Sequence, residues 1–233
     1  KKAGKDVTLI ARGEHLKKIQ KQGLTLEKMW DKTEENISIP ATDMEHYAEH
    51  PDVIFVCVKG YSLQETIPFI KRIARKNTIV IPVLNIYGTG GKMQKKLPEL
   101  TVTDGCIYVS ANIKEPGKLL QHGQILHIVF GVRDKAEFRP ELKEIQKDLC
   151  DSHIDGTLSE NIRREALEKF SYVSPIGAAG LYYHATAADF QEEGEARELF
   201  KTMIKEIAAL AEAMGVPFQK DMVDVNLKIL SNL

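Results

Sequence analysis

The sequence contains few cysteines, no long hydrophobic run and almost no net charge. Its three cysteines, Cys57, Cys106 and Cys150, are widely spaced and odd in number, which predicts reduced thiols in a cytoplasmic protein. The apolar runs fall well short of the ~20 residues that a helix needs to cross a bilayer. A net charge of −1 over 233 residues gives no sign of a nucleic-acid partner, and the scattered histidines predict no metal site. With 43% hydrophobic and 28% charged residues, the composition is that of an ordinary globular protein with one large domain or two modest ones.

The first 158 residues alternate between strand and helix patterns. Residues 6–11, 53–58 and 78–84 form apolar runs, and the last two are typical of strands buried on both faces of a parallel sheet. Cys57 lies in the second run and is therefore predicted to be a core residue rather than a nucleophile. The alternation predicts an α/β parallel-sheet domain over residues 1–158.

From Ser159 onward the pattern is helical. Residues 196–214 carry apolar side chains every three or four positions and end at a glycine followed by a proline, and residues 221–233 start a further helix. The sequence therefore predicts an all-helical second domain over residues 159–233.

The first five residues have the composition of a helix end. Lysines stand beside a glycine at position 4, and an apolar run follows at once. This arrangement predicts that a strand and most of a helix precede Lys1.

The helix that opens the second domain carries a lysine beside its apolar stripe. Ser159 is a good N-cap, and Lys169 lies on or next to a stripe at helical spacing. The stripe consists of Ile162, Ala166, Phe170 and Val173. Two readings are open at this point: the Lys169 stem runs along the surface with its ammonium in water, or the ammonium points into a cleft where its pKa can be tuned.

Polar side chains follow three predicted strands of the first domain. Arg12, Lys59 and Asn85 come directly after residues 7–11, 53–58 and 78–84. Ligands of such sheets bind beyond the carboxyl ends of the strands, and an arginine after the second strand of a dinucleotide fold suits a 2′-phosphate. If a first strand and its glycine-rich turn precede Lys1, Arg12 indicates NADP(H); otherwise it is an ordinary surface arginine. The loop 88–91 is glycine-rich but lacks the dinucleotide fingerprint.

Taken together, these residues resemble the ketopantoate reductase family along the whole chain. The segments that carry the resemblance are residues 7–13, 53–59, the loop that opens at Asn85, residues 114–117 and residues 161–169. The resemblance implies an NADPH-dependent 2-dehydropantoate 2-reductase with a Rossmann domain and a C-terminal helical domain, which commonly forms a homodimer.

The resemblance also implies roles for individual residues. Lys169 matches the catalytic lysine, a general acid that protonates the carbonyl oxygen during hydride transfer. Asn85 matches the asparagine that contacts cofactor and substrate, and Arg12 the residue near the 2′-phosphate. Lys59 and Ile113 match positions at the cofactor site. A glycine-rich fingerprint is implied before Lys1, and a serine and a glutamate of the substrate site beyond Leu233.

The sequence departs from the family at three positions near the implied site. Ile86 stands where a glycine usually follows the asparagine, and Val173 and Gly177 replace two asparagines that hold the substrate. Because polar contacts discriminate strongly between substrates, this predicts a changed preference, toward a bulkier or more apolar 2-oxo acid. The alternative function is a catalytically silent NADP(H)-binding or sensor protein of the same fold. Val173 and Gly177 favour this alternative, and Lys169 and Asn85 oppose it.

Overall fold

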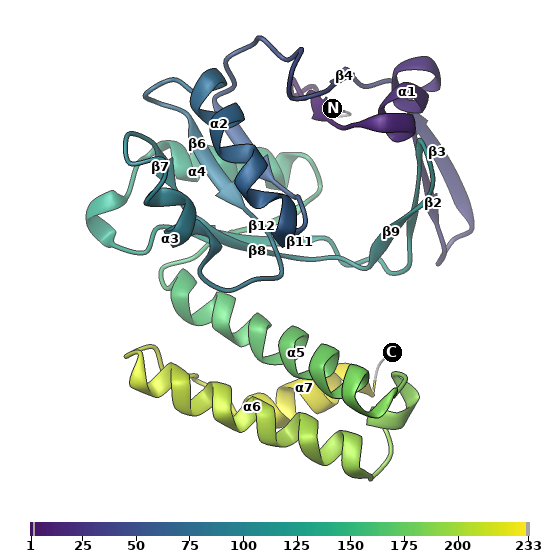
Figure 1. The fold of residues 1–233 in the computed structure, drawn as a ribbon, viewed down its shortest axis with the longest axis vertical. Coiled ribbons are helices and arrows are strands. Elements are labelled where there is room, and N and C mark those ends of the chain that lie inside the picture. The colour runs from purple at the N-terminus through teal and green to yellow at the C-terminus, as the bar shows by residue number, and fades with distance from the viewer. Residues whose placement is uncertain (2, 232–233) are drawn as a thin grey trace.

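The computed structural model describes residue 1 and residues 3–231, which form a sheet domain followed by a helical domain (Figure 1). The α/β class that the sequence predicts is confirmed. The strands are β1 (Leu9–Ile10), β2 (Leu24–Lys28), β3 (Thr33–Ile37), β4 (Ala41–Thr42), β5 (Val53–Val56), β6 (Ile79–Pro82), β7 (Thr101–Val102), β8 (Asp104–Tyr108), β9 (Ala111–Glu115), β10 (Lys118–Gln121), β11 (His127–Gly131) and β12 (Asp155–Leu158). The α-helices are α1 (Gly13–Gln22), α2 (Leu63–Ile73), α3 (Thr89–Gln94), α4 (Glu141–Asp151), α5 (Ile162–Tyr183), α6 (Glu195–Ala213) and α7 (Met222–Leu230), with short 3₁₀ turns η1 (Gly60–Ser62), η2 (Lys135–Glu137) and η3 (Ala188–Phe190).

Strand β6 is the central strand of the three-stranded sheet β5-β6-β7. It pairs in parallel with β5 and β7, and all four of its residues are buried. Its side chains alternate between two cores: Val80 packs with residues of α2 and α3, whereas Ile79 and Ile81 pack with residues of β11 and α4. Helices therefore cover both faces of β6, as its uninterrupted apolar sequence predicts.

Strand β5 is less buried than its sequence predicts. It ends at Val56, Phe55 is 38% exposed and Cys57 is exposed. The prediction that Cys57 is a core residue is wrong, because β5 lies at the edge of its three-stranded sheet and has only β6 beside it among the described residues. Strand β1 is likewise short, and within the described part of the chain it pairs with β4 alone.

Helix α5 begins after Asn161 and runs unbroken through Pro175. The N-cap is Asn161, whose side chain accepts a hydrogen bond from the backbone N–H of Arg164, so the prediction that Ser159 is the N-cap is wrong. Ser159 instead donates to the Glu165 carboxylate and accepts from the Asn161 backbone, and it supports the cap from the preceding turn. A short polar side chain two positions further on therefore takes the role that spacing alone assigned to Ser159.

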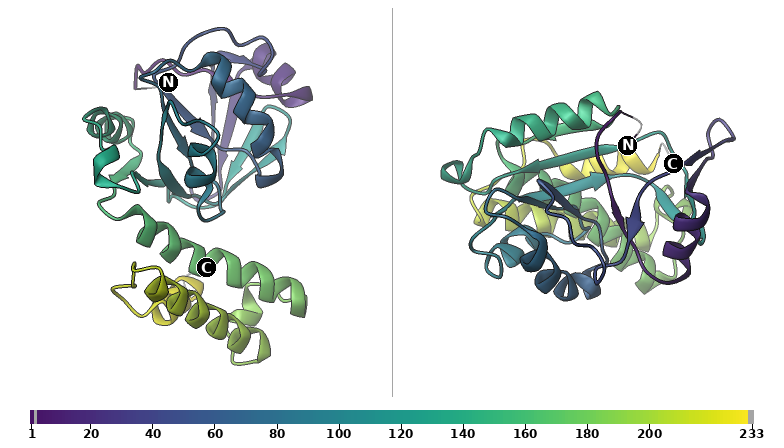
Figure 2. Two further views of the ribbon diagram at one scale, coloured as in Figure 1. Left: turned by 60° about the vertical axis from the view of Figure 1, so that its left-hand side comes forward. Right: turned by 90° about the horizontal axis from the view of Figure 1, so that it is seen from above.

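Helix α5 lies between the sheet domain and the α6–α7 pair (Figures 1 and 2). One stripe faces the other helices and contains the fully buried Leu167 and Ala179. On another side, Ile162 packs with Cys106 and Val129 of the sheet domain. A single helix thus contributes to the cores of both domains.

The last helices follow their sequence patterns closely. Helix α6 ends where Gly215 adopts a φ of 69°, and Asp221 caps α7 through the backbone N–H of Val223. The predicted continuation of α7 to residue 233 includes two residues outside the described part of the chain. The predicted helix end at residues 1–5 includes Lys2, which is also outside it, while Ala3 and Gly4 form a turn. No helix within the described residues is both long and apolar enough to cross a membrane.

Gly90 allows α3 to pack tightly against the segment between β7 and β8. A Cβ at Gly90 would lie 2.0 Å from the Thr103 carbonyl oxygen, whereas a Cβ at neighbouring Gly91 would meet nothing closer than 3.8 Å. We expect Gly90→Ala to lower the free energy of unfolding by about 2 kcal/mol, and Gly91→Ala to leave it unchanged or slightly raised. Urea unfolding of both variants measures the difference, and equal effects would contradict the proposed close contact.

Candidate functional site

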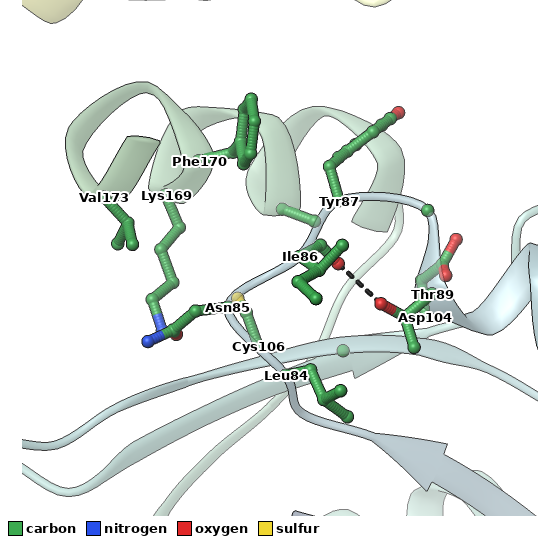
Figure 3. A pocket seen from close by; sticks show the side chains of 13 residues that line it. Leu84, Asn85, Ile86, Tyr87, Thr89, Asp104, Cys106, Lys169, Phe170 and Val173 are labelled. Atoms are coloured by element: carbon green, nitrogen blue, oxygen red, sulfur yellow. Dashed lines mark hydrogen bonds between the residues drawn. The ribbon is translucent and has the colours of Figure 1, made fainter. Parts of the chain in front are cut away.

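The ammonium of Lys169 extends from α5 to the sheet domain and meets Asn85 there (Figure 3). Lys169 Nζ donates a hydrogen bond of 2.8 Å to Asn85 Oδ1 and a second one to the backbone carbonyl of Ile107. It also lies 5.0 Å from the centre of the Tyr108 ring. The ammonium is therefore held at the junction of the two domains, and the reading in which it extends into water is wrong.

Burial changes the protonation behaviour of Lys169. Removing the ammonium from water penalises the charged form, so the pKa of Lys169 is lowered from its usual value. The Cys106 thiol lies beside it, and burial raises the pKa of that thiol to about 11. Burial therefore makes the Lys169 ammonium a stronger acid and the Cys106 thiol a weaker one. Of the two groups, Lys169 is the one suited to donate a proton.

A small pocket surrounds this contact, between α5 and the loop that follows β6 (Figure 3). Its polar groups near Lys169 are few, and most of its wall is apolar. The lining residues are Leu84, Asn85, Ile86, Tyr87, Gly88, Thr89, Asp104, Gly105, Cys106, Ala166, Lys169, Phe170 and Val173.

Two of the other predicted cofactor residues, Arg12 and Lys59, follow strands β1 and β5. The loop after β5 touches the loop after β6, since a Cβ on Gly60 would lie 2.3 Å from the Ile86 side chain. Lys59 precedes that glycine and is exposed. Arg12 follows β1, and its exposed guanidinium lies 3.5 Å from Glu65 in the first turn of α2, which follows Lys59 after the turn η1. Lys59 therefore lies next to the loop that carries Asn85, and Arg12 lies beside the first turn of α2. The direct contact is the one between Asn85 and Lys169.

Of the remaining predicted residues, Val173 and Gly177 lie on α5 after Lys169, and Ile113 lies on β9. Val173 lines the pocket one turn beyond Lys169 (Figure 3). Gly177, one turn further, is exposed, and a Cβ there would meet nothing within 4 Å among the described atoms. Ile113 is 58% exposed on β9, opposite Leu119, and is not among the described residues that line the pocket. Their roles as substrate and cofactor residues stay predictions.

The sequence alone does not point to Cys106 and Tyr108. They are two residues apart on β8, and side chains at that spacing point to the same face of a strand. Both therefore lie on the face that α5 covers. Cysteine and tyrosine are common at partly buried strand positions, and nothing in their spacing predicts a lysine from a helix 60 residues later. Period-two alternation in residues 104–108 is the one signal that could have selected them.

His46 and His50 are four residues apart, a spacing at which two histidines on one helix can bind a metal. Here they lie outside any helix and have different partners: His46 Nδ1 contacts Asp43, and His50 Nδ1 contacts the Ile73 carbonyl. Within the described residues no group of three or more His, Cys, Asp or Glu could hold a metal ion.

Comparison with known proteins assigns both parts of the chain to one group. Residues 1–135 match the family model described as ketopantoate reductase PanE/ApbA, and residues 161–233 match its C-terminal model. A 2-dehydropantoate 2-reductase of Pyrococcus horikoshii is 26% identical over 234 residues, covering 97% of this chain and 72% of the relative. YkpB of Bacillus subtilis, named an uncharacterized oxidoreductase, is 18% identical, covering 99% and 75%.

Solved structures share the fold at low sequence identity. A PanE/ApbA family ketopantoate reductase from Ralstonia eutropha superposes with a TM-score of 0.86 at 20% identity, covering 100% of this chain and 74% of that one. D-mandelate dehydrogenase in complex with NADH and anilino(oxo)acetate gives a TM-score of 0.86 at 18% identity, covering 99% and 73%.

Proposed function

Because the chain belongs to the ketopantoate reductase family, we propose that it reduces a 2-oxo acid, ketopantoate or a related compound, to the 2-hydroxy acid with NADPH. The observation that carries this proposal is the 2.8 Å hydrogen bond between Lys169 and Asn85, which joins the two domains at the carboxyl end of β6. This is the edge of a parallel sheet where ligands bind.

Lys169 has the chemistry of the general acid. Its ammonium carries the proton that the carbonyl oxygen of the substrate needs, and partial burial lowers the pKa of Lys169 toward the working range of an acid catalyst. Asn85 accepts a hydrogen bond from the ammonium and so fixes the direction of its remaining protons. When bound, the reduced nicotinamide supplies the hydride for the carbonyl carbon.

The described residues fit a cofactor with a 2′-phosphate. Arg12 is exposed at the end of β1, and its contact with the exposed Glu65 carboxylate is long, at 3.5 Å. Such an exposed pair is weak, so the guanidinium is available to an anion. Lys59 and Asn85 would add polar contacts at the same edge. The similar D-mandelate dehydrogenase was solved with NADH, so the choice between NADPH and NADH rests on Arg12.

We expect Arg12→Ala to raise the KM for NADPH by about tenfold or more and to leave the KM for NADH nearly unchanged, because a charge-assisted contact to phosphate is lost. Steady-state kinetics of the full-length protein with both cofactors measures this. Lys17→Ala, an equal loss of charge on exposed α1, is the matched control. Equal changes for NADPH and NADH would remove Arg12 from phosphate recognition.

Turnover itself decides between an enzyme and a silent binding protein. The full-length protein is incubated with NADPH, ketopantoate and a set of other 2-oxo acids, and NADPH absorbance is followed. We expect oxidation with at least one substrate. Tight NADPH binding without turnover of any of them would contradict the enzymatic proposal and support a sensor.

Pairing of two copies through the helical domain stays a prediction.

A further inference from the structure

Strand β8 provides two of the contacts that hold the Lys169 ammonium. Ile107 accepts a hydrogen bond through its backbone carbonyl, and the next residue, Tyr108, presents its ring 5.0 Å from Lys169 Nζ. That distance lies within the ~6 Å over which a ring face attracts a cation. Asn85, the other partner, lies in a loop, whereas Tyr108 lies in a strand that pairs along its whole length with β11.

The Tyr108 ring is itself held in place. It stacks on His127 of β11 with the ring centres 5.4 Å apart and the planes 19° from parallel. Tyr108 and His127 are paired residues of the antiparallel ladder, so the backbone of both strands supports the stack. The ring is therefore a fixed surface, while the lysine has a flexible stem of four carbons.

From this geometry we infer that Tyr108 is a positioning residue, whose ring face holds the protonated Lys169 against Asn85. The inference rests on the proposed role of Lys169 as general acid. A ring attracts the ammonium but not the neutral amine, so it both directs the side chain and favours its charged form. It thereby opposes the burial that lowers the pKa of Lys169.

The other titratable groups around Lys169 do not replace this contact. On β8, burial raises the pKa of both the Cys106 thiol and the Tyr108 hydroxyl, so both are neutral at pH 7. Glu165 and Glu168 on α5 lie near enough to influence Tyr108, but the pKa of Glu168 is raised by its own burial. His127 lies against the Tyr108 ring. None of these side chains has a hydrogen bond or ion pair to Lys169 among the described contacts.

The test compares Tyr108→Phe, which keeps the ring, with Tyr108→Leu, which removes it. We expect Tyr108→Phe to stay close to wild type. We expect Tyr108→Leu to lower kcat about tenfold with little change in the KM for NADPH, and to move the alkaline decline of kcat to lower pH by about one unit. Tyr172→Leu is the matched control, because Tyr172 is a partly buried tyrosine on α5 that packs on Phe200 in the helical domain.

A shape-preserving series separates attraction from packing. Phenylalanines with one, two and three fluorine atoms at position 108 progressively weaken the negative face of the ring at nearly constant shape. We expect log kcat to fall steadily along the series. A flat series, or an unchanged pH profile in Tyr108→Leu, would overturn the positioning role. If Tyr108→Leu does not fold, the fluorinated series alone decides.

Failure of this inference can be told apart from failure of the proposed function. Activity that survives in Lys169→Ala would refute the general-acid role itself. A severe defect in Lys169→Ala together with a flat fluorinated series would refute only the role of Tyr108.

Discussion

Replacement of Lys169 by alanine is expected to lower kcat for 2-oxo acid reduction by at least ~100-fold, the low end for loss of a general acid. The variant removes the proton donor but leaves Asn85 and the pocket wall in place. Single-turnover kinetics with saturating NADPH measures the chemical step directly. Lys205→Ala on the exposed side of α6 is the matched control and is expected to match wild type. An unchanged kcat in Lys169→Ala would remove Lys169 from the mechanism.

The pH dependence of kcat provides an independent check on the same residue. A general acid must be protonated, so activity is present below its pKa and is lost as the pH rises through it. Because burial lowers the pKa of Lys169, the decline is expected at a lower pH than the usual lysine value of ~10.4. Lys169→Ala should lack this decline.

The second large effect concerns the choice of substrate. Val173 lies in the pocket wall one turn from Lys169 and cannot form a side-chain hydrogen bond, and Gly177 leaves open space one turn further. A substrate hydroxyl directed there would lose its water without a protein partner. We therefore expect the protein to prefer trimethylpyruvate, which is ketopantoate without its hydroxyl group, when kcat/KM values are compared.

Restoring polar side chains should reverse this preference. The double variant Val173→Asn, Gly177→Asn is expected to shift the kcat/KM ratio toward ketopantoate by about 100-fold, roughly tenfold for each hydrogen bond gained. Ala178→Asn, at an exposed neighbouring position of α5, is the control and should leave the ratio unchanged. A double variant with the wild-type ratio would show that this side of α5 does not face the substrate.

The sequence was sufficient for the layers of the fold, and it singled out two residues that meet in the candidate site. The apolar run of β6 and the helical spacing of α6 reflect local periodicity, which a single sequence contains in full. Lys169 stood out because a cation interrupted an apolar stripe, and Asn85 because it ended a buried strand. The resemblance to a family assigned both residues to one site, and the structure adds the hydrogen bond between them.

Other features depend on which segments meet, and periodicity does not contain that information. Cys57 was expected in the core because its run is apolar, yet its strand has a neighbour on only one side among the described residues. Tyr108 looks like any strand aromatic until α5 places a lysine over its ring. Ser159 and Asn161 are both good caps, and the chain geometry around them decides between the two.

The position of α5 between the two domains determines how this protein can be recombined with a relative. A crossover inside α5 would separate Lys169 from the side chains that seat its helix in the α6–α7 core, such as Ala179. A crossover just before Asn161 would keep the helix whole but place Lys169 over a foreign β8, whose residue at the position of Tyr108 replaces the ring. The exchangeable module is therefore discontinuous in sequence: α5 has to be transferred together with β8 and the loop after β6.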